Sequence, residues 1–172
     1  FYRVGASALI LAIMIRLLKI KTADNRSSQF KMIANGILLG THWTLFFLAV
    51  KIANVSVCMI GMATTSLWTA ILEPLIIKNR SFRRYEFGLG AIMIAAIILI
   101  TGGDFNYYLG LMIAIISAGI GTLFSIINSQ FTKNHHHYAI AYYQMLGATA
   151  IAGLTIIGVS LWRDSLPEMS LN

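Results

Sequence analysis

Charged residues are scarce in this chain of 172 residues, where Asp, Glu, Lys and Arg together make up 11%. Soluble domains carry about 25% charged and about 45–50% apolar residues, whereas this chain is 58% apolar. Its single cysteine, Cys58, excludes an internal disulfide and is interpreted as a small buried hydrophobe within an apolar run. The composition therefore argues against a domain that folds in water.

Motifs for catalysis and nucleic-acid binding are also lacking. Without a Gly-x-Ser-x-Gly elbow, a His-Glu-x-x-His helix or a phosphate-binding glycine loop, we predict no enzyme activity and no cofactor. The net charge of +7 does not indicate a nucleic-acid partner, because the basic residues lie in short gaps between apolar runs. We expect no metal at His135, His136 and His137, because adjacent loop side chains do not converge on one ion.

Six apolar segments are present, and about 20 apolar residues are what a helix needs to cross a bilayer. We predict that all six are helices, because an unpaired strand edge is unstable in lipid. Their approximate limits are Phe1–Leu18, Met32–Ala53, Val55–Ile77, Phe87–Thr101, Tyr107–Ile127 and Ala139–Trp162. The predicted fold class is all-α, a polytopic transmembrane helix bundle in which short connections make consecutive helices antiparallel neighbours and lipid is the surrounding partner.

The distribution of Lys and Arg indicates the orientation of this bundle. Ten of the thirteen basic residues lie in or beside the first, third and fifth connections: Arg16, Lys19, Lys21, Arg26, Lys31, Lys78, Arg80, Arg83, Arg84 and Lys133. The positive-inside rule places these connections in the cytosol. Because the chain opens on Phe1, without Met and directly in apolar sequence, we expect a fragment of a longer protein.

Two patterns concern how the helices pack and repeat. The fifth segment has small residues at spacings of three or four, which would let another helix approach closely: Gly110, Ala114, Ala118, Thr122 and Ser125. Residues 1–8 resemble residues 142–149, and the two helices that contain them are predicted to run in opposite directions. Inverted repeats of this kind are typical of secondary transporters.

Glu73 is the most informative polar residue within the apolar segments, where ionisable groups mark functional sites. Ser66, Thr69 and Glu73 fall on one helix face, so Glu73 could bind a coupling proton or cation in a water-filled cavity. The alternative is a carboxylate near the cytoplasmic headgroups, neutralised by Lys78 or Arg80.

Four further residues are candidates for a substrate site. Arg3 would hold an anionic group of the substrate, unless it extends to the outer interface instead. Trp43 would stack on the substrate, and His42 would provide a titratable donor. The alternative for His42, which shares a helix face with Asn35, is an interhelical hydrogen bond. Gln144 is a fourth polar candidate, for which a structural role is the favoured alternative.

The order of these features resembles the EamA family of the drug/metabolite transporter superfamily. Phe1–Ala12 is similar to the family's second helix, Leu48–Ser56 to its Ala-Leu-Lys-Tyr-Thr corner, and Phe82–Gly90 to its entry into helix five. The resemblance implies ten helices in two inverted repeats, with residues 1–101 as helices two to five of the first repeat. Residues 102–172 would be the first two helices of the second. The family's helix-four proline falls at Ser66.

The expected function is therefore secondary transport. The chain would belong to an exporter of small metabolites, such as amino acids or drug-like compounds, that works by alternating access in the bacterial cytoplasmic membrane. Its partners would be a small-molecule substrate and a coupling proton or cation. The candidate substrate-binding residues are Arg3, His42, Trp43, Glu73 and Gln144. The alternative function is a non-transporting membrane scaffold or assembly protein.

Overall fold

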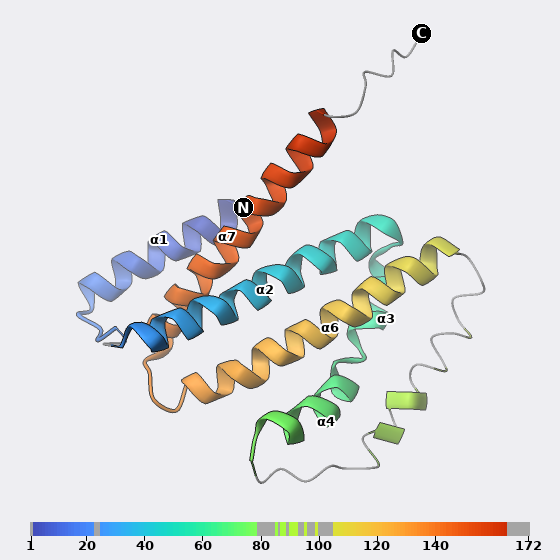
Figure 1. The fold of residues 1–172 in the computed structure, drawn as a ribbon, viewed down its shortest axis with the longest axis horizontal. Coiled ribbons are helices and arrows are strands. Elements are labelled where there is room, and N and C mark those ends of the chain that lie inside the picture. Colours follow the sequence, from blue (N-terminus) through green and yellow to red (C-terminus); the bar gives the residue numbers. More distant parts are fainter. Residues whose placement is uncertain are drawn as a thin grey trace.

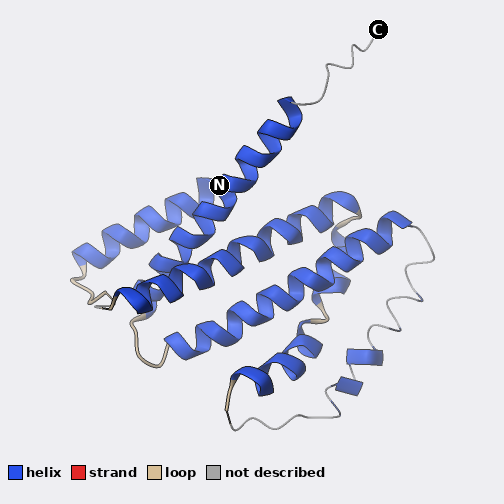
Figure 2. Cartoon of the chain, in the orientation of Figure 1, coloured by secondary structure: helices blue, strands red, loops and turns tan. Residues whose placement is uncertain are grey.

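The computed structural model describes residues 2–22, 25–78, 85, 87, 88, 90–92, 95, 99 and 105–164. All regular secondary structure in these residues is helical (Figure 2). The helices are α1 (Tyr2–Leu17), α2 (Arg26–Ile52), α3 (Val55–Met62), α4 (Thr65–Ile76), α6 (Phe105–Phe131) and α7 (His137–Asp164). Four stretches are long and apolar enough to cross a membrane, namely Arg26–Ile52, Val55–Ile76, Tyr107–Phe131 and His137–Leu161. The described part of the chain is thus all-helical, and four spans of this length and composition are typical of a multi-pass membrane protein.

Five of the six predicted segments correspond to described helices. The fourth, Phe87–Thr101, lies mostly outside the described residues, and the few positions described within it are helical. Helix α2 begins six residues before the predicted start at Met32. The reason is a polar N-cap, in which the Asn25 side chain accepts a hydrogen bond from the Ser27 amide at 2.9 Å.

Helix α2 is the centre of the bundle (Figure 1). It packs against α6 on one side and α7 on the other, while α1 packs on α7, and α3 and α4 pack on α6. The prediction that consecutive helices are neighbours is therefore wrong for α1 with α2 and for α6 with α7, whose main contacts are with other helices. Small residues lie at the contacts of α2 with α7, of α2 with α6 and of α3 with α6, where they let the helix backbones approach closely.

Glycines allow α2 and α7 to cross at short range. A Cβ on Gly36 would clash with the backbone carbonyl of Gln144, and a Cβ on Gly147 would clash with that of Ile33. A Cβ on Gly40, one turn along α2, would lie 3.0 Å from the Ala148 Cα. Gly36 and Gly40 form a Gly-x-x-x-Gly pair, which lets two helix backbones approach in a membrane.

The small residues of α6 form its contact face, as predicted, with one exception. Gly110, Ala114, Ala118 and Thr122 are buried, whereas Ser125 is exposed. A Cβ on Gly61 of α3 would lie 2.5 Å from the Ala114 Cβ, so the two helices touch closely there.

The predicted third segment, Val55–Ile77, corresponds to a single candidate membrane span, Val55–Ile76, but its helix is interrupted. Helix α3 ends at Met62 and α4 begins at Thr65, and between them the Thr64 amide bonds to the Gly61 carbonyl three residues back rather than four. Side-chain hydroxyls donate hydrogen bonds to the backbone carbonyls at the break. Thr64 donates to Gly61, Thr65 to Met62 and Ser66 to Ala63. Polar side chains of this kind make a broken helix tolerable at membrane depth.

The Thr64 hydroxyl is expected to stabilise this break. Thr64 is fully buried, and its Oγ1 lies 2.7 Å from the Gly61 carbonyl. Thr64→Val keeps the shape and removes the bond, which should lower the free energy of unfolding by roughly 1 kcal/mol. Thermal unfolding of the purified protein in detergent measures this. Ser66→Ala is the matched control, because Ser66 is exposed and its bond is 3.4 Å long. Equal effects of the two substitutions would contradict the expectation.

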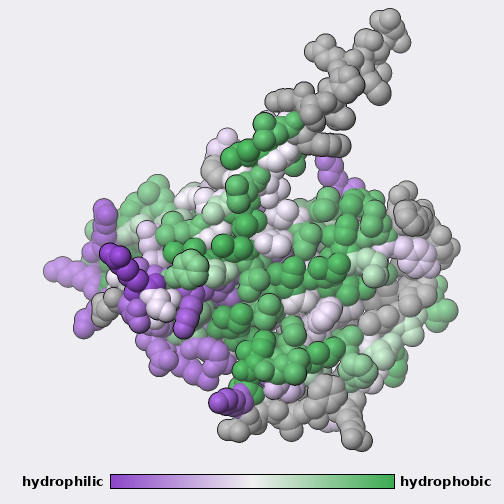
Figure 3. All heavy atoms as spheres, in the orientation of Figure 1, coloured by the Kyte–Doolittle hydropathy of each residue, from purple (hydrophilic) through white to green (hydrophobic). Residues whose placement is uncertain are grey.

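Apolar atoms cover the middle of the molecule, and hydrophilic residues gather at one end (Figure 3). That end contains the connections between α1 and α2 and between α6 and α7, with Lys19, Lys21, Arg26, Lys31 and Lys133 all exposed. Buried contacts between Met32 and Ile140 hold these helix ends together. The first and fifth connections therefore lie on the same side, as an alternating topology requires, while the placement of this side in the cytosol stays a prediction.

Candidate functional site

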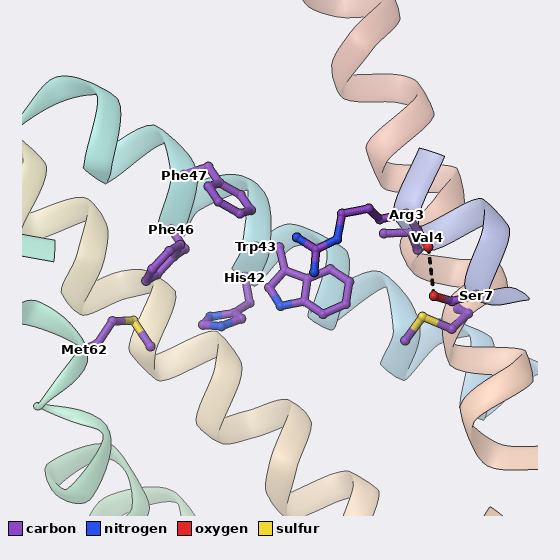
Figure 4. Close-up of a pocket in the computed structure, with 9 residues that line it drawn as sticks. Arg3, Val4, Ser7, His42, Trp43, Phe46, Phe47 and Met62 are labelled. Atoms are coloured by element: carbon purple, nitrogen blue, oxygen red, sulfur yellow. Dashed lines mark hydrogen bonds between the residues drawn. The ribbon is translucent and has the colours of Figure 1, made fainter. Parts of the chain in front are cut away.

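A cavity of about 520 Å³ lies between α1, α2 and α7 and reaches the end of α3 (Figure 4). Its lining residues are Arg3, Val4 and Ser7 of α1, His42, Trp43, Phe46 and Phe47 of α2, Met62 of α3 and Met145 of α7. A cavity of this size fits a small molecule. One cation, one imidazole and one indole are set among aromatic and thioether side chains, so the cavity is amphipathic.

The cavity lies at the middle of the predicted membrane span. His42 is 11 residues after Lys31 and 9 residues before Lys51. At 1.5 Å per residue these separations are roughly 16 Å and 14 Å along the helix axis. If the two lysines mark the membrane surfaces, His42 and Trp43 are close to the centre of a hydrocarbon core about 30 Å thick.

His42 is held against α6 by Ser117, which is fully buried. The His42 Nδ1 lies 2.8 Å from the Ser117 carbonyl oxygen and 3.0 Å from Ser117 Oγ. Ser117 Oγ donates its own hydrogen to the His42 carbonyl, at 2.8 Å. A carbonyl oxygen can only accept, so Nδ1 carries a hydrogen and donates it to Ser117.

A glycine on α6 makes room for this imidazole. A Cβ added to Gly121 would lie 2.9 Å from His42 Nδ1 and 3.0 Å from Cε1. His42 thus makes an interhelical hydrogen bond, which was the alternative predicted for it, and it also lines the cavity. Asn35, seven residues earlier, contacts α6 as well, where its Nδ2 lies 3.4 Å from the Phe124 carbonyl. Both residues therefore face α6, as their spacing predicted.

Arg3 provides the positive charge of the cavity. Its side chain is exposed and extends from α1 towards α2 on the side of Trp43 (Figure 4). The Ser7 hydroxyl donates to the Arg3 backbone carbonyl at 2.8 Å, so this hydroxyl is engaged within its own helix. The guanidinium is thus not enclosed by the described side chains, and it offers a planar set of donors for an anionic group.

The structure brings together three of the five candidate residues, Arg3, His42 and Trp43. Gln144 lies outside the cavity lining, buried between helices, where its Nε2 donates to Asn128 Oδ1 at 2.7 Å and joins α7 to α6. Glu73 also lies outside the lining, half-buried on α4. Neither residue lines the cavity, so a role for either in binding stays a prediction.

The lining residues Phe46, Met62 and Met145, and the partner of His42, were not predicted from the sequence. Phe46 follows His42 by one helical turn, and this spacing could have placed it on the same face. Ser117 is the partner of His42 and lies three residues after Ala114 on the small-residue face of α6. Met62 and Met145 gave no signal, because a methionine in an apolar helix is equally suited to lipid, core or cavity.

The histidines of the α6–α7 connection lie at the opposite end of α2 from Lys51, well away from the cavity. The rings of His136 and His137 stack with their centroids 4.3 Å apart, and both residues are exposed. Within the described parts of the chain, no three His, Cys, Asp or Glu side chains are placed to hold a metal ion.

No protein-family model, curated protein or solved structure matches this chain.

Proposed function

We propose that this chain is part of a secondary transporter that exports small amphipathic metabolites across the bacterial cytoplasmic membrane. The transporter would be of the ten-helix inverted-repeat type found in the EamA family and would work by alternating access. The observation that supports this most directly is the cavity itself. It combines Arg3, His42 and Trp43 at the depth where secondary transporters bind their substrates.

The cavity lining favours a substrate with an anionic group and an apolar body. Arg3 offers a fixed positive charge for a carboxylate. Phe46, Phe47, Met62 and Met145 offer apolar surface, and thioethers adapt to varied shapes. Among the described lining residues no carboxylate is present to hold a purely cationic ligand. Amino acids and related carboxylates fit this description.

The interruption between α3 and α4 supports the same function. Transporter sites are commonly built where a transmembrane helix is discontinuous, and Met62, the last residue of α3, lines the cavity. The break provides a place where α4 can change direction relative to α3 without loss of buried hydrogen bonds. A static scaffold has no need of such a break beside a charged cavity.

Flux measurements test this proposal. The product of the reading frame that contains this chain is reconstituted in proteoliposomes and assayed with labelled amino acids and other apolar carboxylates. Saturable flux is expected, and Trp43→Ala should raise the half-saturation concentration about tenfold, because one aromatic contact is worth about 1.4 kcal/mol.

Phe30→Ala is the matched control for Trp43→Ala. Phe30 is also an aromatic residue of α2, but it is 72% exposed and outside the cavity lining. It should leave the half-saturation concentration unchanged. A folded wild-type protein without saturable flux for any compound would contradict transport and favour the scaffold or assembly alternative.

A further inference from the structure

Basic side chains from separate parts of the chain gather at one end of the molecule (Figure 3). This basic end is formed by five exposed residues of the α1–α2 connection, the first turns of α2 and the α6–α7 connection: Lys19, Lys21, Arg26, Lys31 and Lys133. Met32, which follows Lys31, packs against Ile140 of α7 and is contacted by Phe131 of α6, so the three helix ends are held together. The fold therefore concentrates like charges, which repel one another.

Within the described residues, no carboxylate forms an ion pair with the basic end. Lys133 has a neutral partner, since its Nζ donates to Gln130 Oε1 at 2.9 Å. A ligand with an anionic group would lower the repulsion and gain charge-assisted hydrogen bonds, which are roughly twice as strong as bonds between neutral groups. The chemistry of the basic end therefore favours an anionic partner.

The basic end lies at the depth of lipid headgroups. His42, near the centre of the predicted span, is 11 residues from Lys31 and 16 residues from Arg26. At 1.5 Å per residue these separations are roughly 16 Å and 24 Å along the helix axis. A hydrocarbon core about 30 Å thick ends about 15 Å from its centre, and the headgroups continue to about 20–22 Å. The side chains of Lys31 and Arg26 can therefore reach lipid phosphates.

Apolar surface adjoins these charges. Leu17 and Leu18, which are 75% and 58% exposed, directly precede Lys19. A ligand at the basic end therefore meets cations and apolar side chains together. A phospholipid has both an anionic phosphate and acyl chains, whereas a soluble phosphate compound offers nothing to the two leucines.

Lys19 occupies a backbone conformation that a lysine rarely adopts, with a φ of 48°. It follows the end of α1 in a Schellman motif, in which the Ile20 amide donates to the Ile15 carbonyl at 3.0 Å. The Lys19 amide itself donates to the Arg16 carbonyl at 3.4 Å. Glycine usually fills this position, because a Cβ is strained there. Strain of this kind points to a use for the side chain, which here carries one of the five charges.

We propose that the basic end binds the headgroup of an anionic phospholipid. The lipid phosphate contacts Lys19 and other residues of the basic end, and an acyl chain packs on Leu17 and Leu18. The bound lipid bridges the α1–α2 and α6–α7 connections and neutralises their mutual repulsion, so it stabilises this end of the bundle. The binding is independent of transport, because no residue of the basic end lines the cavity.

Titration with two lipids that have the same acyl chains tests the proposal. The product of the reading frame that contains this chain is purified in a neutral detergent and titrated with dioleoylphosphatidylglycerol or dioleoylphosphatidylcholine. Native mass spectrometry measures the binding. Phosphatidylglycerol should bind more than tenfold more tightly, because one Lys or Arg near an anionic headgroup is worth about fivefold in affinity and several are present. Equal affinity for the two lipids would overturn the proposal.

Lys31→Gln and Lys51→Gln form a matched pair, because each removes an exposed lysine of α2, at opposite ends of the helix. Lys31→Gln should weaken the binding of phosphatidylglycerol about fivefold. Lys51→Gln should leave it unchanged. Equal losses in the two variants would mean that any surface lysine has the same effect, and the basic end would then not be a binding site.

Lys19→Gly separates lipid binding from folding. Glycine adopts a φ of 48° without strain, so the melting temperature in lipid-free detergent should stay the same or rise. The affinity for phosphatidylglycerol should nevertheless fall about fivefold, because one charge is lost. Undiminished affinity in this variant would refute the assignment of Lys19 to the lipid site.

Free phosphate distinguishes a lipid from a soluble ligand with the same charged group. Isothermal titration with inorganic phosphate and with glycerol phosphate should show weaker binding than that of phosphatidylglycerol, because neither has an acyl chain to pack on Leu17 and Leu18. Phosphatidylglycerol should also raise the melting temperature more than phosphatidylcholine does. If either soluble phosphate bound as tightly as phosphatidylglycerol, the partner would not be a lipid and the proposal would fail.

Discussion

Gly36→Ala is expected to prevent the protein from folding stably, although it adds only one methyl group. The new Cβ would clash with the Gln144 backbone carbonyl of α7, and a backbone atom cannot rotate away as a side chain can. Overpacking of a rigid contact lowers stability by about 3 kcal/mol or more, against a total stability of about 5–15 kcal/mol. Size-exclusion chromatography and thermal unfolding in detergent measure the loss.

Gly158→Ala is the control, because among the described residues no atom beyond its own helical turns lies within 4 Å of the Cβ that it would add. Alanine is the better helix former by about 1 kcal/mol in both variants. The two substitutions should therefore act in opposite directions, with Gly158→Ala neutral or stabilising. A Gly36→Ala protein that elutes and unfolds as wild type would contradict the observed crossing of α2 and α7.

The spans of the helices could be predicted from sequence because a bilayer imposes a length. An apolar run of about 20 residues in lipid has no stable alternative to a helix, and this requirement located α2, α6 and α7. The ends were less certain, since they depend on local capping. The start of α2 at Arg26 is set by one Asn25 side chain, which a hydropathy pattern does not register.

The pairing of the helices could not be predicted in the same way. The Gly36–Gly40 pair indicates that α2 has a close partner, but not that the partner is α7, which is last in the chain order. The break between α3 and α4 was also missed. A proline would have marked it, whereas Ser66 stands at the position where the resembled family has proline. Threonine and serine hydroxyls accommodate a break without requiring one.

The polar residues of the cavity were easier to predict than its apolar ones. Arg3, His42 and Trp43 could be selected from the sequence because polar side chains within apolar helices are energetically costly and therefore mark functional sites. That rule could not separate a cavity from a helix interface, and it also selected Gln144, which bonds to Asn128 between two helices. The distinction depends on tertiary packing, as does the selection of Met62 and Met145 from eight methionines.

Arg3→Gln is expected to give the largest loss of binding among the cavity variants. Arg3 is the one charged residue among the described residues that line the cavity, so no other side chain there can replace its attraction for a carboxylate. Hydrogen bonds to charged groups are worth enough to change affinity roughly 10- to 100-fold. Isothermal titration with leucine and with 4-methylpentanoate should show a loss of this size for both ligands, because both carry the carboxylate.

Two further variants make this loss specific to the position and to the shape of the guanidinium. Arg16→Gln removes the same charge from the last turn of α1, outside the cavity lining, and should leave affinity unchanged. Arg3→Lys keeps the charge but loses the planar pair of donors, so its affinity should lie between that of wild type and that of Arg3→Gln. If Arg16→Gln weakened binding as much as Arg3→Gln, the effect would come from overall charge. The carboxylate would then be held elsewhere, and Trp43 and His42 would have to act without an ionic contact beside them.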